Sequence, residues 1–179
     1  PDWLEQQADL VYVHSDNRLG VAGNTNRLLR CLSRFKYKLI LNDDVEILKK
    51  GWDSFYFDVM EKTGIHHFCY RQAGIYGAHS RYESQSERKG HKINTVTGKP
   101  QGSVIAFDHK AFETVGFFDE SFGIYGMEHV DWSQRVWECG LQEKGFYDVN
   151  GSDLFFKIHA EPSIVGGKSP KELINSIKS

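Results

Sequence analysis

The chain has 179 residues, of which 40% are hydrophobic and 26% are charged, as expected for one globular domain spanning residues 1–179. Its 22 Lys and Arg residues are balanced by 24 Asp and Glu residues, a net charge of -2, which gives no electrostatic basis for nucleic-acid binding. No apolar run approaches the roughly 20 residues of a transmembrane segment, and the first residues lack the pattern of a signal peptide. The three cysteines form no Cys-x-x-Cys pair, so we expect reduced thiols and a cytoplasmic location.

The first half of the chain alternates short apolar runs with amphipathic segments. Strands are expected at residues 10–13, 37–41 and 65–70. A helix capped by residues 24–26 should follow the first strand, and a helix at residues 52–62, ended by Gly64, should follow the second. This rhythm predicts an α/β fold with a mixed, mainly parallel sheet flanked by helices.

The second half opens with a long polar stretch at residues 78–101. A connection of this length is either a lid over a ligand or a disordered surface loop. An apolar strand is expected at residues 102–107, and Asp108 should then cap a short helix that Gly116 closes. Further elements are expected at residues 130–138 (a helix), 146–149 and 154–159 (strands), and 168–179 (a helical tail).

The apolar run at residues 38–41 stops abruptly on Asn42, Asp43 and Asp44. A buried strand that ends there would place adjacent acids in the crevice beyond its carboxyl end, where open α/β sheets bind ligands. Neighbouring carboxylates repel each other unless a cation or a proton separates them. The segment therefore predicts a metal or nucleotide site, although a solvated turn before a helix would use the same residues.

A second acidic cluster, formed by Glu128, His129 and Asp131, begins a predicted helix. Acids in the first turn of a helix are stabilised by the helix dipole, by roughly 0.3–1 kcal/mol, and this accounts for either acid singly. A Glu-His pair at a helix start can also hold a general base that faces a ligand.

Four segments in this order resemble the GT-A nucleotide-sugar glycosyltransferases, especially the large family 2 group. Each is similar to a motif of that family at the corresponding place in the chain, and together they cover residues 10–140. They are Asn17-Arg-Leu-Gly-Val-Ala-Gly-Asn-Thr-Asn26, Leu41-Asn-Asp-Asp-Val-Glu46, residues 102–107 with Phe112-Glu-Thr-Val-Gly-Phe-Phe-Asp-Glu120, and Glu128-His-Val-Asp131 with Arg135.

The resemblance implies a GT-A-like, Rossmann-related fold and transfer of a hexosyl or hexosaminyl group from a nucleotide-diphosphate donor, a UDP-sugar by expectation, to a glycan or other hydroxyl acceptor. In such an enzyme Mn²⁺ or Mg²⁺ offsets the charge of the leaving diphosphate. Asp44 is the first implied metal ligand, and His159, at the end of a late strand, is either another ligand or an ordinary surface or core histidine. The implied donor-binding residues are Asn17, Asn26, Asn42, Asp43 and Gly102, with Asn42 or Asp43 contacting the ribose or a metal-bound water.

Glu128, His129 or Asp131 would deprotonate the acceptor hydroxyl in an inverting displacement. Trp132, Tyr125 and Phe118 would either stack on sugar faces or pack in the core.

Two features depart from the family pattern. Family members begin with a strand, a helix and a strand whose acid reads the uracil ring, so this chain is either a fragment or a reduced fold. His129 stands where the family usually carries an aspartate base, although Glu-His at this place resembles some galactosaminyl- and galactosyltransferase motifs. The alternatives are a non-catalytic module that binds a nucleotide or a glycan, and a metal-dependent phosphohydrolase that uses Asp43, Asp44 and Glu128.

Overall fold

The computed structural model describes Val13, Asn17 and residues 19–72, 80–124, 126–143 and 145–159. The strand expected at residues 10–13, apart from Val13, and the helical tail expected at residues 168–179 lie outside these residues. Within the described part of the chain, none of the helices combines the length and the apolar character needed to cross a bilayer.

Four α-helices, two short 3₁₀ helices and eight strands make up the described residues. The helices are α2 (Gly20–Leu32), α3 (Trp52–Thr63), α4 (His109–Val115) and α5 (Glu128–Glu138), with the 3₁₀ helices η2 (Glu120–Phe122) and η3 (Ser152–Leu154). The strands are β1 (Tyr37–Leu41), β2 (Val45–Ile47), β3 (His67–Cys69), β4 (Ser80–Arg88), β5 (His91–Gly98), β6 (Val104–Asp108), β7 (Phe146–Val149) and β8 (Phe156–Ile158).

The prediction of a mainly parallel, Rossmann-related sheet is wrong. The described strands form three small sheets, ordered β1-β6-β3, β2-β8 and β4-β5-β7, and every pairing in them is antiparallel. β1 and β3 do run in the same direction, as the strand–helix–strand rhythm suggests, but β6 from later in the chain lies between them in the opposite direction. An apolar run indicates a buried strand without indicating its direction, so the sequence did not reveal this insertion.

The long polar stretch is a hairpin rather than a lid or a disordered loop, at least over residues 80–98. β4 and β5 pair along their length and are joined through Lys89 and Gly90, which have φ angles of 51° and 79°. Positive φ at both central residues is typical of the tight turns that match strand twist. Ile93 and Val96 are the fully buried apolar residues that the hairpin contributes, both from β5. Because the rest of the stretch is mostly polar, its composition predicts a loop and not a pair of strands.

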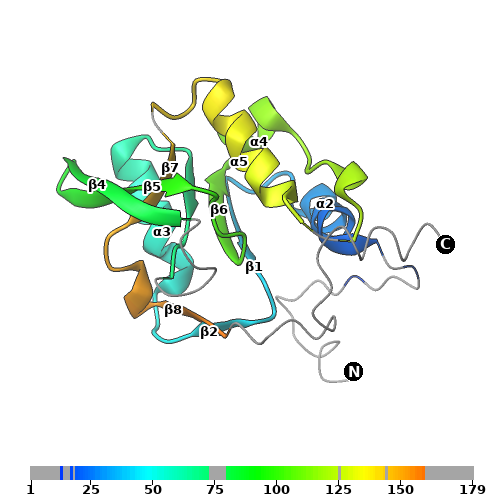
Figure 1. Ribbon diagram of the computed structural model, residues 1–179, viewed down its shortest axis with the longest axis horizontal. Helices are drawn as coiled ribbons and strands as arrows, with labels where there is room; N and C mark the ends of the chain where they lie inside the picture. The colour runs from blue at the N-terminus through cyan, green and yellow to red at the C-terminus, as the bar shows by residue number, and fades with distance from the viewer. Residues whose placement is uncertain are drawn as a thin grey trace.

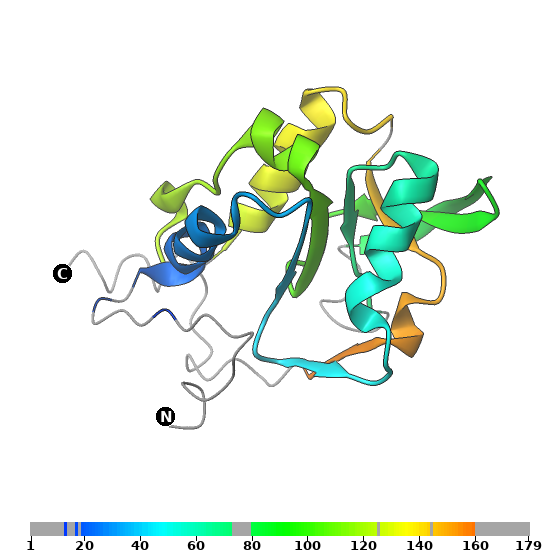
Figure 2. The ribbon, with the colours of Figure 1, turned by 180° about the vertical axis from the view of Figure 1, so that it is seen from behind.

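The central sheet separates two hydrophobic cores. In Figures 1 and 2, α3 covers one face of β1-β6-β3, while α2, α4 and α5 gather on the other. β6 serves both cores because successive side chains of a strand point to opposite faces. Val104 and Ala106 pack in the core with α3, whereas Ile105 and Phe107 pack in the core with α2, α4 and α5.

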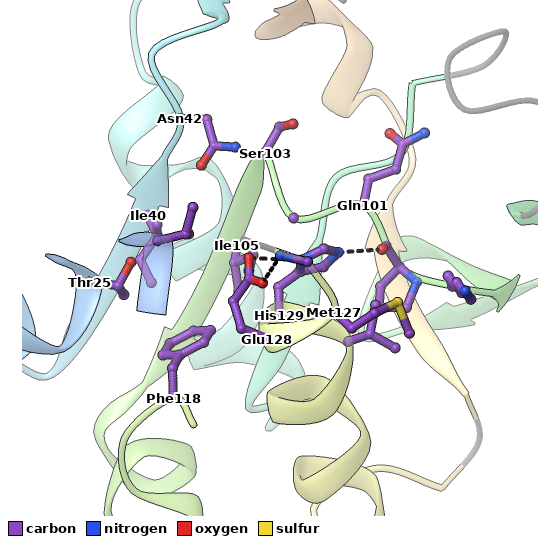
Figure 3. A pocket seen from close by; sticks show the side chains of 16 residues that line it. Thr25, Ile40, Asn42, Gln101, Ser103, Ile105, Phe118, Met127, Glu128 and His129 are labelled. Carbon is purple, nitrogen blue, oxygen red and sulfur yellow. Dashed lines mark hydrogen bonds and ion pairs between the residues drawn. The ribbon is translucent and has the colours of Figure 1, made fainter. Parts of the chain in front are cut away.

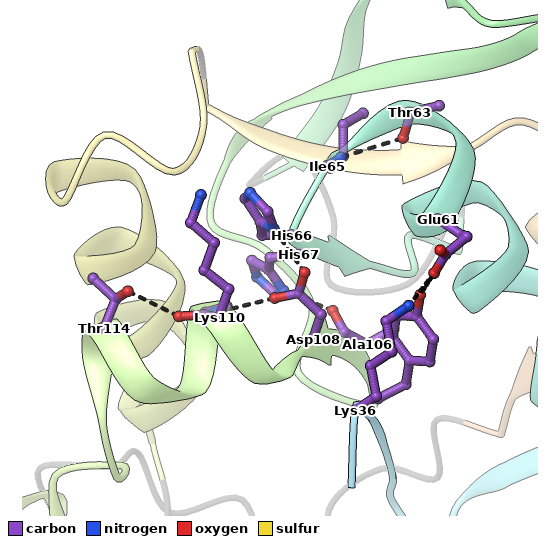
Figure 4. Close-up of polar contacts among 12 residues, drawn as sticks. Lys36, Glu61, Thr63, Ile65, His66, His67, Ala106, Asp108, Lys110 and Thr114 are labelled. Carbon is purple, nitrogen blue, oxygen red and sulfur yellow. Dashed lines mark hydrogen bonds and ion pairs between the residues drawn. The ribbon is translucent and has the colours of Figure 1, made fainter.

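The start of α4 is stabilised by a side chain, as the sequence predicts. The Asp108 carboxylate accepts a hydrogen bond from the backbone N–H of Ala111 (2.9 Å), which satisfies one of the unpaired N–H groups at a helix start. Its other oxygen lies 2.6 Å from Nδ1 of His66 (Figure 4). Gly116 ends the helix, and its N–H donates to the Phe112 carbonyl.

His67 joins the central sheet to α5. Its Nδ1 lies 3.0 Å from the Ala106 carbonyl oxygen and its Nε2 2.9 Å from Oγ of Ser133. A carbonyl oxygen only accepts, so Nδ1 carries the proton and Nε2 accepts from the serine hydroxyl. The ring is fully buried and meets Trp132 edge to face. Burial lowers the pKa of His67 to about 4, although the bond to Ala106 opposes the shift.

A second buried polar group, Asp148, ties the hairpin sheet to α3. Its carboxylate accepts hydrogen bonds from the hydroxyls of Tyr56 (2.8 Å), Tyr82 (2.9 Å) and Ser152 (2.9 Å) and from the backbone N–H of Arg71 (3.1 Å). Burial outweighs these bonds and raises the pKa of Asp148 to about 6.

We expect the His67→Gln variant to lose less stability in acid than the wild-type protein. The folded-state pKa of His67 is depressed from 6.5 to about 4, so the unfolded state binds the proton more readily. The stability that the neutral ring contributes is therefore complete above pH 6.5 and is lost as the pH falls toward 4. Over this window the effect on the free energy of unfolding reaches about 3 kcal/mol.

Urea unfolding of both proteins at pH 7, 6, 5 and 4 measures this difference. Glutamine retains a donor for Ala106 and an acceptor for Ser133 but does not titrate. Asp148, whose pKa is raised, has the opposite pH dependence, but it is present in both proteins and cancels in the comparison. Parallel stability curves for the two proteins would contradict the prediction.

Candidate functional site

A cavity of about 490 Å³ lies where α2, the end of β1, the start of β6 and the start of α5 meet. The antiparallel pairing of β1 with β6 brings the carboxyl end of one strand to the amino end of the other. There the Asn42 N–H donates to the Ser103 carbonyl (2.9 Å). Asn42, Ser103 and Glu128 all line the cavity (Figure 3). The two polar clusters found in the sequence therefore reach a common hollow through Asn42 and Glu128.

Glu128 is the buried acid of this cavity, with a relative exposure of 5%. It opens α5 after Met127, whose φ of 70° is left-handed, and one of its oxygens accepts from the Gly126 N–H (2.6 Å). The other oxygen lies 3.5 Å from Nδ1 of His129. Burial alone would raise the pKa of Glu128, but His129 and the backbone N–H groups outweigh it, and the pKa is lowered. The carboxylate is therefore ionised at neutral pH and can accept a proton.

His129 is held from three sides. Its Nε2 lies 3.1 Å from the Pro100 carbonyl oxygen, so this nitrogen donates and has no free lone pair for a substrate proton. Its Nδ1 faces Glu128. A methyl group added at Gly102 would come within 2.5–2.8 Å of the His129 ring atoms, so the ring packs directly on the glycine backbone. Gly102 lines the cavity and leaves room for this ring; its predicted role in donor binding stays a prediction.

Asp131 is not among the residues that line the cavity. Its carboxylate pairs with Nε of Arg135 (2.9 Å), one turn further along α5. Arg135 also donates to the carbonyl oxygens of Val115 (2.8 Å) and Phe117 (3.0 Å). The pair thus anchors the segment after α4, and the geometry does not favour Asp131 as the base.

Asn17 and Asn26 of the first motif also lie away from the cavity lining. Asn26 is buried in α2, where its amide donates to the Phe118 carbonyl (2.8 Å) and its oxygen accepts from the Phe118 N–H (2.9 Å). The amide also donates to Glu120 (2.9 Å). Asn26 therefore fixes the segment before η2, while Asn17 is exposed. Their predicted contacts with a donor stay predictions.

Residues 24–26 do not cap α2, because the helix already begins at Gly20. The Val21 N–H donates to the Ile124 carbonyl (2.8 Å). Gly20 has a φ of +73°, and a Cβ there would lie 2.2 Å from the Gly123 carbonyl oxygen. This close approach between distant segments sets the start of the helix and turns Val21 and Thr25, which the sequence analysis missed, toward the cavity.

The three polar side chains of the turn after β1 lie in different surroundings. Asn42 lines the cavity, whereas Asp43 is exposed and Asp44 is half-buried outside its lining. The Asp44 Oδ1 atom is buried without a hydrogen-bond partner. Burial raises the pKa of Asp44; the charge of Asp43 adds to the shift and that of His159 opposes it.

Antiparallel pairing of β2 with β8 brings His159 beside Asp44. The His159 N–H donates to the Asp44 carbonyl (2.8 Å), and Nε2 of its ring pairs with the Glu46 carboxylate at 2.7 Å. No group of three or more His, Cys, Asp or Glu side chains is arranged to hold a metal ion among the described residues. The Asp44 Oδ1 atom has no hydrogen-bond partner, whereas Nε2 of His159 is occupied by Glu46, so a cation at Asp44 would take most of its ligands from phosphates and waters.

The aromatic residues proposed for sugar stacking have different surroundings. Trp132 is fully buried, stacks on Phe118 with ring centroids 5.3 Å apart, and donates from Nε1 to the Gly116 carbonyl (2.8 Å). Trp132 is thus a core residue. Phe118 is 5% exposed and lines the cavity, while Tyr125 lies outside the described residues.

The sequence analysis also missed Gln101, Ser103 and Met127, which line the cavity. Gln101 is held by the backbone of Gln72, whose N–H donates to it (2.8 Å) and whose carbonyl accepts from it (3.2 Å). The only signal for Gln101 and Ser103 is their position at the start of an apolar strand. Met127 has no local signal, since its left-handed backbone is known only from the structure.

No protein-family model matches the chain. An uncharacterized glycosyltransferase of Acanthamoeba polyphaga mimivirus is 24% identical over 151 residues, which are 84% of this chain and 57% of the relative. Polypeptide N-acetylgalactosaminyltransferase 3 of Mus musculus is 34% identical over 58 residues, 32% of this chain and 9% of the relative. The chain therefore spans little more than half the length of the viral protein and a small part of the mouse protein. Both comparisons support a relationship with glycosyltransferases, without assigning it to family 2 in particular.

Proposed function

We propose that this chain carries the catalytic site of a metal-dependent glycosyltransferase that moves a hexosyl or hexosaminyl group from a UDP-sugar to a hydroxyl acceptor with inversion. The proposed kinship with family 2 enzymes rests on the four motifs in the sequence. The observation that carries the proposal is the Glu128 carboxylate, buried and ionised in a cavity that Asn42, the first residue of the acidic turn, also lines. The two relatives named as glycosyltransferases support the transfer of a sugar, the coarser part of this proposal.

In the proposed reaction Glu128 accepts the proton of the acceptor hydroxyl. The acceptor oxygen forms a bond to the anomeric carbon on the face opposite the diphosphate. The bond between that carbon and the diphosphate oxygen breaks, and its electron pair leaves with the nucleotide. Glu128 ends the step protonated and returns the proton to solvent. A base in the correct position contributes roughly 100- to 10,000-fold to such a reaction.

The acidic turn would hold the nucleotide end of the donor. Asp44 and His159 are the residues proposed to bind Mn²⁺ or Mg²⁺, and Asn42 or Asp43 would contact the ribose or a metal-bound water. Such a cation supplies positive charge that offsets the charge developing on the leaving diphosphate. Because the described residues form no cluster of three or more metal ligands, we expect the cation to bind tightly only together with the nucleotide.

Calorimetric titration of UDP in the presence of Mn²⁺ tests the binding half of the proposal. Asp44→Ala should weaken UDP binding at least tenfold, while Asp58→Ala, the same change at an exposed acid of α3, should not alter it. Asp44→Ala should not lower the unfolding midpoint, since a buried oxygen without a partner is removed. Chelation of the metal should reduce wild-type binding to the level of the variant.

Equal Mn²⁺-dependent affinity in all three proteins would contradict the metal assignment. A parallel assay of UDP release from UDP-sugars tests turnover. UDP binding without any turnover would favour the non-catalytic nucleotide-binding module instead.

A further inference from the structure

The walls of the cavity differ in chemistry on the two sides of Glu128. In Figure 3, Asn42, Ser103 and Gln101 lie on one side of the carboxylate, and Thr25, Ile40 and Phe118 lie on the other. The first side offers the Asn42 amide and the Ser103 hydroxyl to a polar ligand, while the Gln101 amide is already bonded to the Gln72 backbone. The second side offers a single hydroxyl, that of Thr25, and otherwise hydrocarbon.

The apolar wall is fixed in place. Phe118 is 5% exposed and stacks on the buried Trp132, and Ile105, which belongs to the same core, is 2% exposed. These side chains are packed from behind, so they cannot turn away when a polar ligand enters. Val21, 39% exposed, also lines the cavity, whereas Met127 lies across Glu128 from this wall (Figure 3).

The cavity is larger than the space that a single reacting hydroxyl group would occupy. A cavity of about 490 Å³ lies within the range of pockets that enclose drug-sized ligands. Sugar hydroxyls placed against the apolar wall would lose their water without gaining hydrogen bonds, whereas an aliphatic or aromatic group would leave water favourably there.

We propose that the acceptor carries an aliphatic or aromatic group next to its reacting hydroxyl, and that this group packs against Val21, Ile40 and Phe118. The inference rests on the proposed function, because it places the donor on the polar side of Glu128 and the acceptor on the apolar side. Ligand affinity should then depend on the apolar part of the acceptor more than on its sugar.

Methyl, butyl and hexyl β-glucosides separate the two contributions, since they share one sugar and differ only in the chain. NMR titration of the methyl-labelled protein measures the affinities, and the Val21 and Ile40 methyl signals locate the ligand. Each buried methylene should improve binding up to about fourfold, so the butyl compound should bind at least tenfold tighter than the methyl compound. Affinity that does not change with chain length would overturn the proposal.

Paired variants test the wall itself. Val21→Ser with Ile40→Thr, two positions of the proposed apolar wall, should reduce the gain from methyl to butyl at least threefold. Leu48→Ser with Leu154→Ser, at two exposed apolar positions away from the cavity, should leave the gain intact; equal gains in both double variants would overturn the proposal. UDP release from the donor without an acceptor is measured separately, so failure of the proposed function would appear as lost donor cleavage and not as lost chain-length dependence.

Discussion

Replacement of Glu128 by glutamine is expected to reduce sugar transfer by about 100- to 10,000-fold while UDP binding in the presence of Mn²⁺ stays within a factor of two or so. Glutamine has the shape of glutamate, and its carbonyl oxygen can still accept from the Gly126 N–H. It cannot accept a proton from a hydroxyl at neutral pH. The loss should therefore appear in kcat, and the affinity for nucleotide should be preserved because the acidic turn is untouched.

Asp131→Asn is the matched control for this variant. It makes the same change of carboxylate to amide three residues further along α5, at a side chain paired with Arg135 outside the cavity. Transfer by Asp131→Asn should stay within a few-fold of the wild-type rate. If Glu128→Gln and Asp131→Asn transferred sugar equally well, neither geometry nor burial would identify the base, and Glu128 would lose its assigned role.

The same comparison tests His129, which the sequence leaves open as a base. The structure gives its Nε2 a carbonyl partner at Pro100 and turns its Nδ1 toward Glu128, so His129 is placed to position Glu128. His129→Gln keeps a donor for Pro100. We expect it to lose less transfer activity than Glu128→Gln, because His129 positions the base and is not itself the base.

Local elements of the fold could be predicted where local chemistry determines them. β1 occupies residues 37–41, as its apolar run indicates, and α3 ends at Gly64, whose φ of 70° suits a left-handed helix end. Asp108 caps α4. Gly64 and Asp108 each satisfy a local requirement of the backbone, and β1 is marked by its own apolar run, although its partner β6 is distant in the chain.

Sheet topology could not be predicted because it depends on distant segments. Nothing in Val104–Asp108 says that this strand will run between β1 and β3 in the opposite direction. The β4–β5 hairpin has one clear local signal, the turn at Lys89 and Gly90, within a stretch of polar composition.

In the candidate site, too, local features could be predicted from the sequence and features that depend on distant segments could not. The sequence marks Asn42 and Glu128, which meet at the cavity, because acids and amides after apolar runs are visible in a single chain. It does not show that Asp44 points outside the cavity lining or that Asn26 is used to hold Phe118. The contact of Asn26 with Phe118 depends on α2, whose start is set by the approach of Gly20 to Gly123, and the surroundings of Asp44 depend on the pairing of β2 with the distant β8.

Trp132→Ala should be the most destabilising single substitution proposed for this molecule, with a loss of about 3–5 kcal/mol in the free energy of unfolding. The indole is fully buried and packs on Phe107 and Phe118, with ring centroids 4.5 Å and 5.3 Å away. Removing it leaves a large cavity and an unpaired carbonyl at Gly116.

Trp137→Ala is the control, because Trp137 lies on the same helix but is 40% exposed. It should change stability by no more than about 0.5 kcal/mol. Trp132→Phe should fall between the two, since it keeps an aromatic ring in the stack but loses the bond to Gly116. Urea unfolding of the three variants gives the order directly, and equal losses for the two alanine variants would contradict the placement of Trp132 in the core. Because Trp132 lies one helical turn after Glu128, Trp132→Phe should also slow transfer more than Trp137→Ala does, which links the packing of α5 to the position of the base.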